Sequence, residues 1–300
     1  MRLILLICLV MLGACSQPSA GIDWDDWLEY QKIRGNMRPE RSAADASFSN
    51  DTLVRNFRTI AFDVEEDPFG LGPLPEEERV PPILRKWQDP IAYRIVSTDE
   101  NLRPRRETVE LFMKRLASLT GLTIRKESET EPLDEDGRTF NLSIMILTDD
   151  EFARLGAFDS FDRPDWSEGE AEAVRSILET VREWYTAPSP CAGTFYYGPE
   201  DGADDYGALS FGLVMVRADL PEALFDSCVE EELTQMMGLF NDDDDVRPSL
   251  FNDINEFALM TDHDEYLLRA LYDERLKPGM SPDQAMPLVR QIIAELRPSG

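Results

Sequence analysis

The chain has 300 residues, 42% of them hydrophobic and 9% aromatic, which is enough to form a folded body with a sizeable core. Its 59 acidic and 30 basic residues give a formal net charge of −29. Nucleic acids and anionic lipid surfaces are bound through Lys and Arg, so this charge argues against both as partners.

The N-terminus has the features of an export signal. One positive charge, Arg2, precedes the apolar run 3–12, which is too short to cross a bilayer and has the length of a signal-peptide core. The run ends in "LGAC", with small residues before Cys15. This ending resembles the lipobox of bacterial lipoproteins, which implies removal of residues 1–14 and acylation of Cys15. An ordinary signal peptide that is cut elsewhere is the alternative.

The residue after Cys15 indicates in which membrane a lipoprotein of this kind is expected. Ser16 stands where lipoproteins retained in the inner membrane commonly carry aspartate. The resemblance therefore implies an outer-membrane lipoprotein that faces the periplasm, with the lipid anchor in the membrane. Several acyl chains hold a protein firmly, whereas a single chain binds only marginally.

Two of the four cysteines remain for the folded part of the chain. Cys8 lies in the signal and Cys15 is the lipidation candidate, which leaves Cys191 and Cys228. The periplasm favours disulfides, so we expect these two residues to form one. Two buried thiols are the alternative.

The remaining sequence alternates between polar segments and periodic apolar segments. Residues 15–49 are mostly small and polar and are predicted to be a tether or linker. Within them, 22–33 has apolar residues near helical spacing and is expected to form a short helix that packs on the body, with packing on a partner as the alternative. The globular part is predicted from residue 50. Helices are expected over 52–62, 105–120, 168–185, 221–239, 264–276 and 281–296, and strands over 91–96, 122–128, 140–148, 192–198 and 207–218. This order predicts an α+β fold with a small mixed sheet and a mostly helical C-terminal part.

The helix predicted over 221–239 carries most of the polar residues that could form a site. At about 100° per residue, its apolar side chains form one stripe that should face the core. Glu232 lies at the edge of that stripe, so we expect partial desolvation and a raised pKa. Glu230 and Thr234 are on the far side and are expected to face water.

The same helix resembles that of the zincin metallopeptidases. Their H-E-x-x-H motif places two zinc-binding histidines one turn apart, with the glutamate as general base. In the metzincin branch a glycine and a third ligand follow. Here the glutamate (Glu232) and the glycine (Gly238) match, but the three ligand positions hold Glu231, Gln235 and Asn241. Met260, in "FALMT", stands about where metzincins have a methionine turn under the metal.

A closer resemblance is to an uncharacterised family of bacterial envelope proteins, known as a domain of unknown function and related to the zincin-like superfamily. Its landmarks are "NFRTIAF", "RKWQDPIAY", "EELTQMMGLFND" and "SLFNDINEFALMTDHDEYLLRALYDERLKPGM". The resemblance covers residues 50–280 and implies a zincin-like domain there, without an activity that can be transferred. Residues 281–300 are then a separate C-terminal helix.

The donor set does not suit zinc, which prefers three good protein ligands and an open position. Gln235 and Asn241 are neutral amides, and Glu231 alone is insufficient. The one histidine, His263, follows Thr261, a candidate helix cap, and is expected to be a surface residue of the first helical turn. We therefore predict no bound metal and no cofactor.

The acidic stretch "NDDDDVRPSLFND" does not fit the pattern of an EF-hand calcium loop. An EF-hand that starts at Asp242 has Val246 and Arg247 at positions five and six, where Asp or Asn and Gly are needed. A start at Asn241 places Val246 at the glycine position. An irregular oxygen-ligand cation site remains possible, and a solvated acidic loop is the simpler interpretation.

Together these features predict a binding protein more than an enzyme. The zincin resemblance implies a substrate groove, and we expect this groove to hold an envelope peptide or protein. The acidic and amide residues expected to line the groove are Glu231, Glu232, Gln235, Asn241 and Asp242. Catalytic residues are not assigned, and Glu232 is a vestigial base. The alternative is a metal-dependent peptidase with oxygen ligands and Glu232 as general base.

Overall fold

The computed structural model describes residues 22–63, 81–97, 100–128, 133, 139–148, 151, 189–198, 202–252 and 254–298. The helix expected over 168–185 lies outside these residues. No helix in the described ranges is both long and apolar enough to cross a membrane.

The centre of the structure is a five-stranded sheet in the order β2-β1-β3-β5-β4. Its strands are β1 (Ile91–Val96), β2 (Ile124–Lys126), β3 (Leu142–Leu147), β4 (Cys191–Tyr197) and β5 (Leu209–Arg217). The first four in that order run parallel, and β4 pairs antiparallel with β5 at the edge. The predicted strands are thus present, and the mixed α+β class is confirmed. Strands β3 and β5 are almost wholly buried, as expected for apolar runs inside a parallel sheet.

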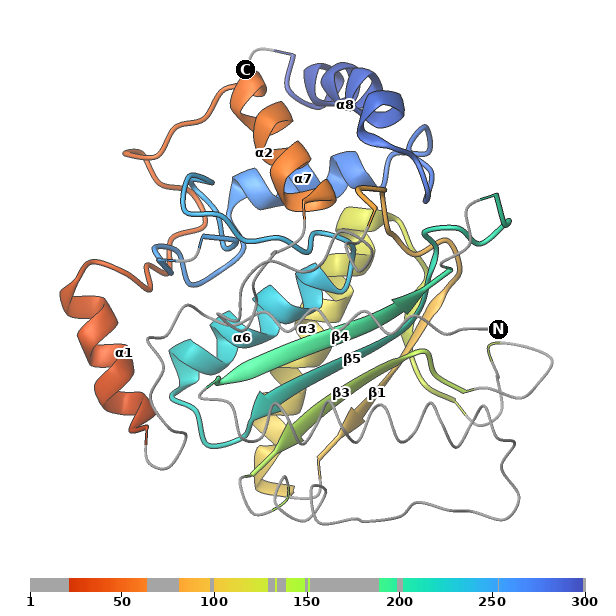
Figure 1. The fold of residues 1–300 in the computed structure, drawn as a ribbon. Helices are drawn as coiled ribbons and strands as arrows, with labels where there is room; N and C mark the ends of the chain where they lie inside the picture. The colour runs from red at the N-terminus through yellow and green to blue at the C-terminus, as the bar shows by residue number, and fades with distance from the viewer. Residues whose placement is uncertain are drawn as a thin grey trace.

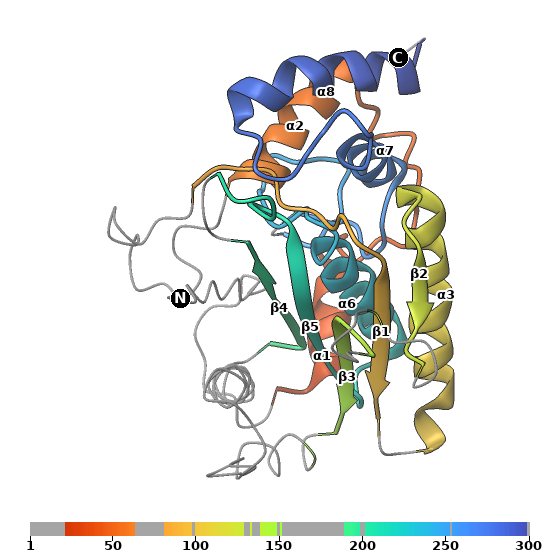
Figure 2. The ribbon, with the colours of Figure 1, turned by 90° about the vertical axis from the view of Figure 1, so that its right-hand side faces the viewer.

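Two helices, α3 (Arg103–Thr120) and α6 (Glu222–Gln235), pack together on one side of this sheet (Figures 1 and 2). The short 3₁₀ turn η2 (Glu100–Leu102) leads into α3. Helix α3 ends as predicted at Gly121, whose φ of 72° is the left-handed conformation that closes many helices. Helix α6 contacts both β4 and β5, so it lies beneath the antiparallel edge of the sheet.

A helical layer covers one end of the sheet (Figure 1, top). It consists of α2 (Asn50–Phe62), α7 (Asp262–Leu271) and α8 (Pro282–Leu296), which contact one another. Ile292 and Ile293 of α8 are buried, so this helix belongs to the same core as α2. The segment predicted as a separate C-terminal helix is therefore packed on the domain.

Much of the segment predicted to be a tether also packs on the domain. Helix α1 (Trp24–Ile33) buries Leu28, and after it Met37 is 4% exposed. The backbone of Arg38 forms a bridge to Phe257, and its guanidinium lies 3.0 Å from Glu256. The apolar spacing of 22–33 predicts α1 and its packing, whereas the contacts of Met37 and Arg38 have no signal in the sequence, because the residues after α1 are polar and aperiodic. A linking role remains a prediction for the residues before α1.

Candidate functional site

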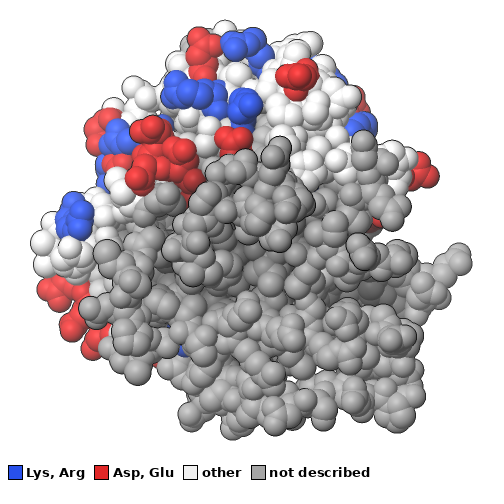
Figure 3. Space-filling view, in the orientation of Figure 1, with Lys and Arg blue, Asp and Glu red and all other residues white. Residues whose placement is uncertain are grey.

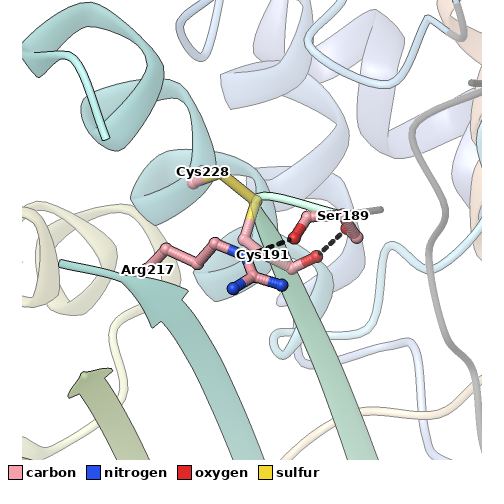
Figure 4. The surroundings of a disulfide bond; sticks show 4 residues. All are labelled: Ser189, Cys191, Arg217 and Cys228. Carbon is pink, nitrogen blue, oxygen red and sulfur yellow. Dashed lines mark hydrogen bonds between the residues drawn. A yellow bond between two sulfur atoms is a disulfide. The ribbon is translucent and has the colours of Figure 1, made fainter. Parts of the chain in front are cut away.

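A disulfide joins α6 to the edge strand. Cys191 at the start of β4 and Cys228 in the middle of α6 are bonded, as predicted (Figure 4). Both residues are buried. Around them, Arg217 Nε donates to the Ser189 carbonyl at 3.0 Å, and the Ser189 hydroxyl donates to the Cys191 carbonyl at 2.5 Å. The bond holds the candidate site helix against β4.

Helix α6 is buried on every side along its second half. All residues from 227 to 240 are buried, including Glu230 at 7% and Thr234 at 0% exposed. The expectation that these two face water is therefore wrong. The sheet and α3 cover two sides of α6, and Arg41 and Met260 contact its outer side. The periodicity of the helix could not show this, because the covering residues are distant in sequence.

Glu230 is the centre of an ion-pair network. Its carboxylate accepts from Arg41 Nη1 at 2.8 Å and Nη2 at 2.5 Å, and Arg115 Nη1 of α3 lies at 3.7 Å. It also accepts the backbone N–H of Met260 at 2.8 Å. The hydrogen bond with Glu230 raises the pKa of Arg41 above its ordinary value. Glu230 therefore connects the N-terminal segment, α3 and the segment before α7.

Glu232 occupies an apolar position directly under β4. Its side chain is 1% exposed, and burial, together with the charge of Asp242, raises its pKa well above the ordinary value. The predicted desolvation of Glu232 is confirmed, and it is more complete than the partial desolvation that was expected. A Cβ added to Gly193 would lie 2.8 Å from Glu232 Oε2, so the carboxyl group occupies the space that this glycine leaves free. Within the described part of the chain, Glu232 Oε2 has no hydrogen-bond partner.

The other predicted groove residues follow on the same side of α6 and in the loop after it. Gln235 is 1% exposed, and its Nε2 donates to Asp242 Oδ2 at 3.4 Å, while its Oε1 has no partner among the described residues. Glu231 and Asn241 are buried and Asp242 is partly exposed. The structure thus brings Glu232, Gln235 and Asp242 together, with Asp242 as the member nearest to solvent.

The end of α6 is fixed by a tight backbone crossing at Gly238. Its φ is 112°, and an added Cβ would lie 2.1 Å from the carbonyl oxygen of Arg85. Only glycine fits such a position. Nearby, Trp87 Nε1 donates to the Met236 carbonyl at 2.7 Å and the Tyr272 hydroxyl donates to the Met237 carbonyl at 2.9 Å. These donors satisfy carbonyls that the helix end leaves without partners.

Met260 and His263 lie in the segment that leads into α7. Met260 is fully buried, and its N–H contacts Glu230 as described above, which places this segment against α6. His263 is 0% exposed, so the prediction of a surface residue is wrong. Its Nδ1 lies 3.2 Å from Asp264 Oδ1, and its Nε2 lies 3.0 Å from Asn56 Nδ2 of α2. The capping role of Thr261, with Asp264 in the first turn, is confirmed.

Two residues of this site were not found from the sequence. Arg41 and Arg115 neutralise Glu230, but they stand far from α6 along the chain, and neither belongs to a recognisable motif. Among the described residues, no group of three or more His, Cys, Asp or Glu side chains is arranged to hold a metal ion.

Comparison with known proteins identifies the family. A family model described as "Protein of unknown function (DUF2927)" matches residues 50–291, which is well over half of the chain. No curated protein and no solved structure matches the chain. The match includes the sheet, α6 and the segment around Met260. The chain therefore belongs to the DUF2927 family of proteins of unknown function.

Proposed function

We propose that this protein is an outer-membrane lipoprotein of the periplasmic face, with a zincin-like domain that binds an envelope peptide or protein without catalysis. The lipid anchor rests on the apolar run and the small residues before Cys15. Metabolic labelling with a palmitate analogue tests it: wild-type protein should be labelled, and a Cys15→Ala variant should not. Labelling that persists in the variant would refute anchoring at Cys15.

The sheet arrangement supports the zincin-like part of the proposal. The zincin resemblance implies a cleft in which a strand edge lies beside the active-site helix. Here the antiparallel strand at the edge of the described sheet is β4, and α6 packs beneath it. An extended peptide can add to an edge strand, where main-chain hydrogen bonds give affinity and side-chain pockets give specificity. In β4 the residues that are not buried are Tyr196 and Tyr197, so the proposed addition is at that end of the strand.

The observation that carries the non-catalytic assignment is the environment of Glu232. A general base has to be ionised and has to reach the water that it activates. Glu232 is instead 1% exposed, packed against the space above Gly193, and its raised pKa favours the neutral acid. In zincins the glutamate at this position acts as general base, so it has to be ionised and has to reach the zinc-bound water. A buried Glu232 whose pKa is raised by desolvation is suited to a structural role under the strand.

The proposed binding residues differ in role, because they differ in exposure. Asp242 is partly exposed and would contact the bound segment directly. Glu231, Gln235 and Asn241 are buried, so we propose that they shape the groove from below and hold Asp242 in place, as the Gln235 contact at 3.4 Å does.

Photo-crosslinking in intact cells tests this placement. Benzoylphenylalanine at position 242 should give covalent adducts with an envelope partner, because the side chain lies at the end of the proposed groove. The same probe at Glu274, an exposed position after α7, is the matched control. If adducts at position 242 do not exceed those at position 274, the proposed groove is wrong.

A second candidate function is a peptidase whose metal has oxygen ligands. One observation favours it: the oxygen atoms Glu232 Oε2 and Gln235 Oε1 are both buried without hydrogen-bond partners in the described chain. Hard oxygen donors of this kind suit Ca²⁺ or Mg²⁺. Stoichiometric metal in purified protein, with peptide cleavage that Glu232→Gln abolishes, would establish this function and overturn the first.

A further inference from the structure

A groove of about 870 Å³ lies between α2 and α8, on the outer side of the helical layer. It is separate from the residues of the proposed binding groove at α6 and β4. Both helices contribute one face to it. Its lining comprises Asp51, Val54, Arg55, Arg58, Pro282, Asp283, Met286, Pro287 and Arg290.

Three arginines border this groove on a chain whose net charge is −29. Arg55 and Arg58 stand three residues apart on α2, and thus on one face, and Arg290 faces them from α8. Figure 3 shows Lys and Arg side chains near the upper end of the molecule, where α2 and α8 lie in Figure 1. They outnumber the two carboxylates of the lining, Asp51 and Asp283, so the groove has a small excess of positive charge on an otherwise acidic protein.

The existing pairing of these arginines is weak or absent. Arg58 lies 3.8 Å from Asp63, and Arg290 lies 2.8 Å from Asp51, but all four side chains are about half exposed or more. Exposed pairs of this kind contribute little and exchange readily with other anions. Arg55 makes no ion pair with any residue in the described ranges. Their guanidinium groups are therefore available to a carboxylate of a partner.

The floor of the groove offers apolar contacts. Val54, Met286 and Pro287 provide apolar surface. Pro287 lies inside α8 and has no N–H, so the carbonyl of Asp283, four residues earlier, lacks its usual helical donor.

We propose that this groove docks an acidic peptide segment of another envelope protein, with carboxylates on the arginines and an apolar side chain on the floor. Bidentate pairing with carboxylates is the geometry that arginine favours. An anionic membrane fits less well, because a flat bilayer does not reach into a groove between two helices. This surface is additional to the proposed function at α6 and β4.

Fluorescence anisotropy with defined peptides tests the proposal. The probe is fluorescein-labelled (Glu-Glu-Leu)₄, compared with (Gln-Gln-Leu)₄, at low and at physiological salt. The delipidated wild-type chain should bind the acidic peptide, and salt should weaken that binding. Replacing Arg55, Arg58 and Arg290 together by Gln should weaken it roughly 10- to 100-fold, at about 2- to 5-fold per exposed charge pair.

The control separates local contacts from net charge. Arg103→Gln removes one positive charge, as each of the three replacements does by itself, at a position on α3 that is 77% exposed. It should alter the affinity less than about twofold, because long-range effects are screened. Circular dichroism checks that each variant is folded.

Three results would overturn the proposal. The first is equal binding of both peptides, and the second is equal loss of affinity with Arg103→Gln and with the triple variant. The third is an arginine-dependent preference for another occupant, either vesicles of phosphatidylethanolamine and phosphatidylglycerol or a second copy of this chain seen by sedimentation.

Discussion

Removal of the Cys191–Cys228 disulfide should destabilise the domain by a predictable amount. The two residues are 37 apart in sequence, and the chain-entropy model for a loop of this length gives about 4 kcal/mol at 25 °C. The effect acts mainly on the unfolded chain, which the bond keeps more compact. Because both cysteines are buried in the core, an additional packing loss is expected when they are replaced by Ala.

Two samples separate the entropic effect from the packing effect. The first is the reduced wild-type chain, in which both sulfur atoms remain, and the second is the Cys191→Ala, Cys228→Ala double variant, each with Cys15 replaced by Ser. Urea denaturation should show a loss of about 4 kcal/mol for the reduced chain and a somewhat larger loss for the double variant. The m-value should rise in both, because an uncrosslinked chain exposes more surface when it unfolds.

The size of the loss tests the reasoning. A decrease below about 1 kcal/mol in the reduced chain, with an unchanged m-value, would refute the chain-entropy account. A large loss in the double variant alone would show instead that packing around the sulfur atoms dominates.

Three further changes test the interior of the site. Glu232→Gln should change the free energy of unfolding in a pH-dependent way. In the unfolded chain the Glu232 carboxyl loses its proton near pH 4.5, whereas in the folded chain burial raises its pKa. Between these two pKa values the wild-type protein should therefore lose about 1.4 kcal/mol of stability per pH unit relative to the variant. Urea denaturation between pH 4 and pH 8 measures this, and a pH-independent difference would contradict the raised pKa. Glu230→Gln should cost roughly 1–3 kcal/mol in urea denaturation, because Arg41 and the Met260 N–H lose a charged acceptor, whereas the exposed Glu222→Gln on the same helix should cost little. Gly238→Ala should cost about 2 kcal/mol or more, since its Cβ would meet the Arg85 carbonyl, and a melting temperature equal to that of wild type would show that the crossing relaxes freely.

Local patterns in the sequence were sufficient for most of the described helices and strands, whereas the disulfide was predicted because Cys191 and Cys228 are the cysteines left after the signal and the lipidation candidate. Helix α3 was predicted from its apolar spacing and from Gly121, and β1 from the stretch Ile91–Val96 after a proline-interrupted start. The predicted cap at Thr261 is present, because capping depends on residues three positions apart. These features are set by neighbours along the chain, so periodicity and residue type were enough.

The predictions that failed depended on distant residues. Glu230 looked like a solvated charge until Arg41 and Arg115 were seen around it. His263 was predicted to be a surface residue because it stands in the first turn of a helix, after the cap Thr261, yet Asn56, more than 200 residues earlier, and Phe48 enclose its ring. In each case a polar side chain is buried with a specific partner, and sequence periodicity carries no information about such partners.

The docking of α1 on the domain limits how far the protein could reach from the membrane. If Cys15 carries the lipid, as we propose, the residues from Ser16 to Asp23 form the linker between the bilayer and helix α1 of the folded domain. Eight residues span roughly 30 Å at full extension. The folded part would then work within about its own width of the membrane surface. A partner would have to come to that surface, which favours other outer-membrane lipoproteins and the membrane-proximal parts of envelope assemblies over partners deep in the periplasm.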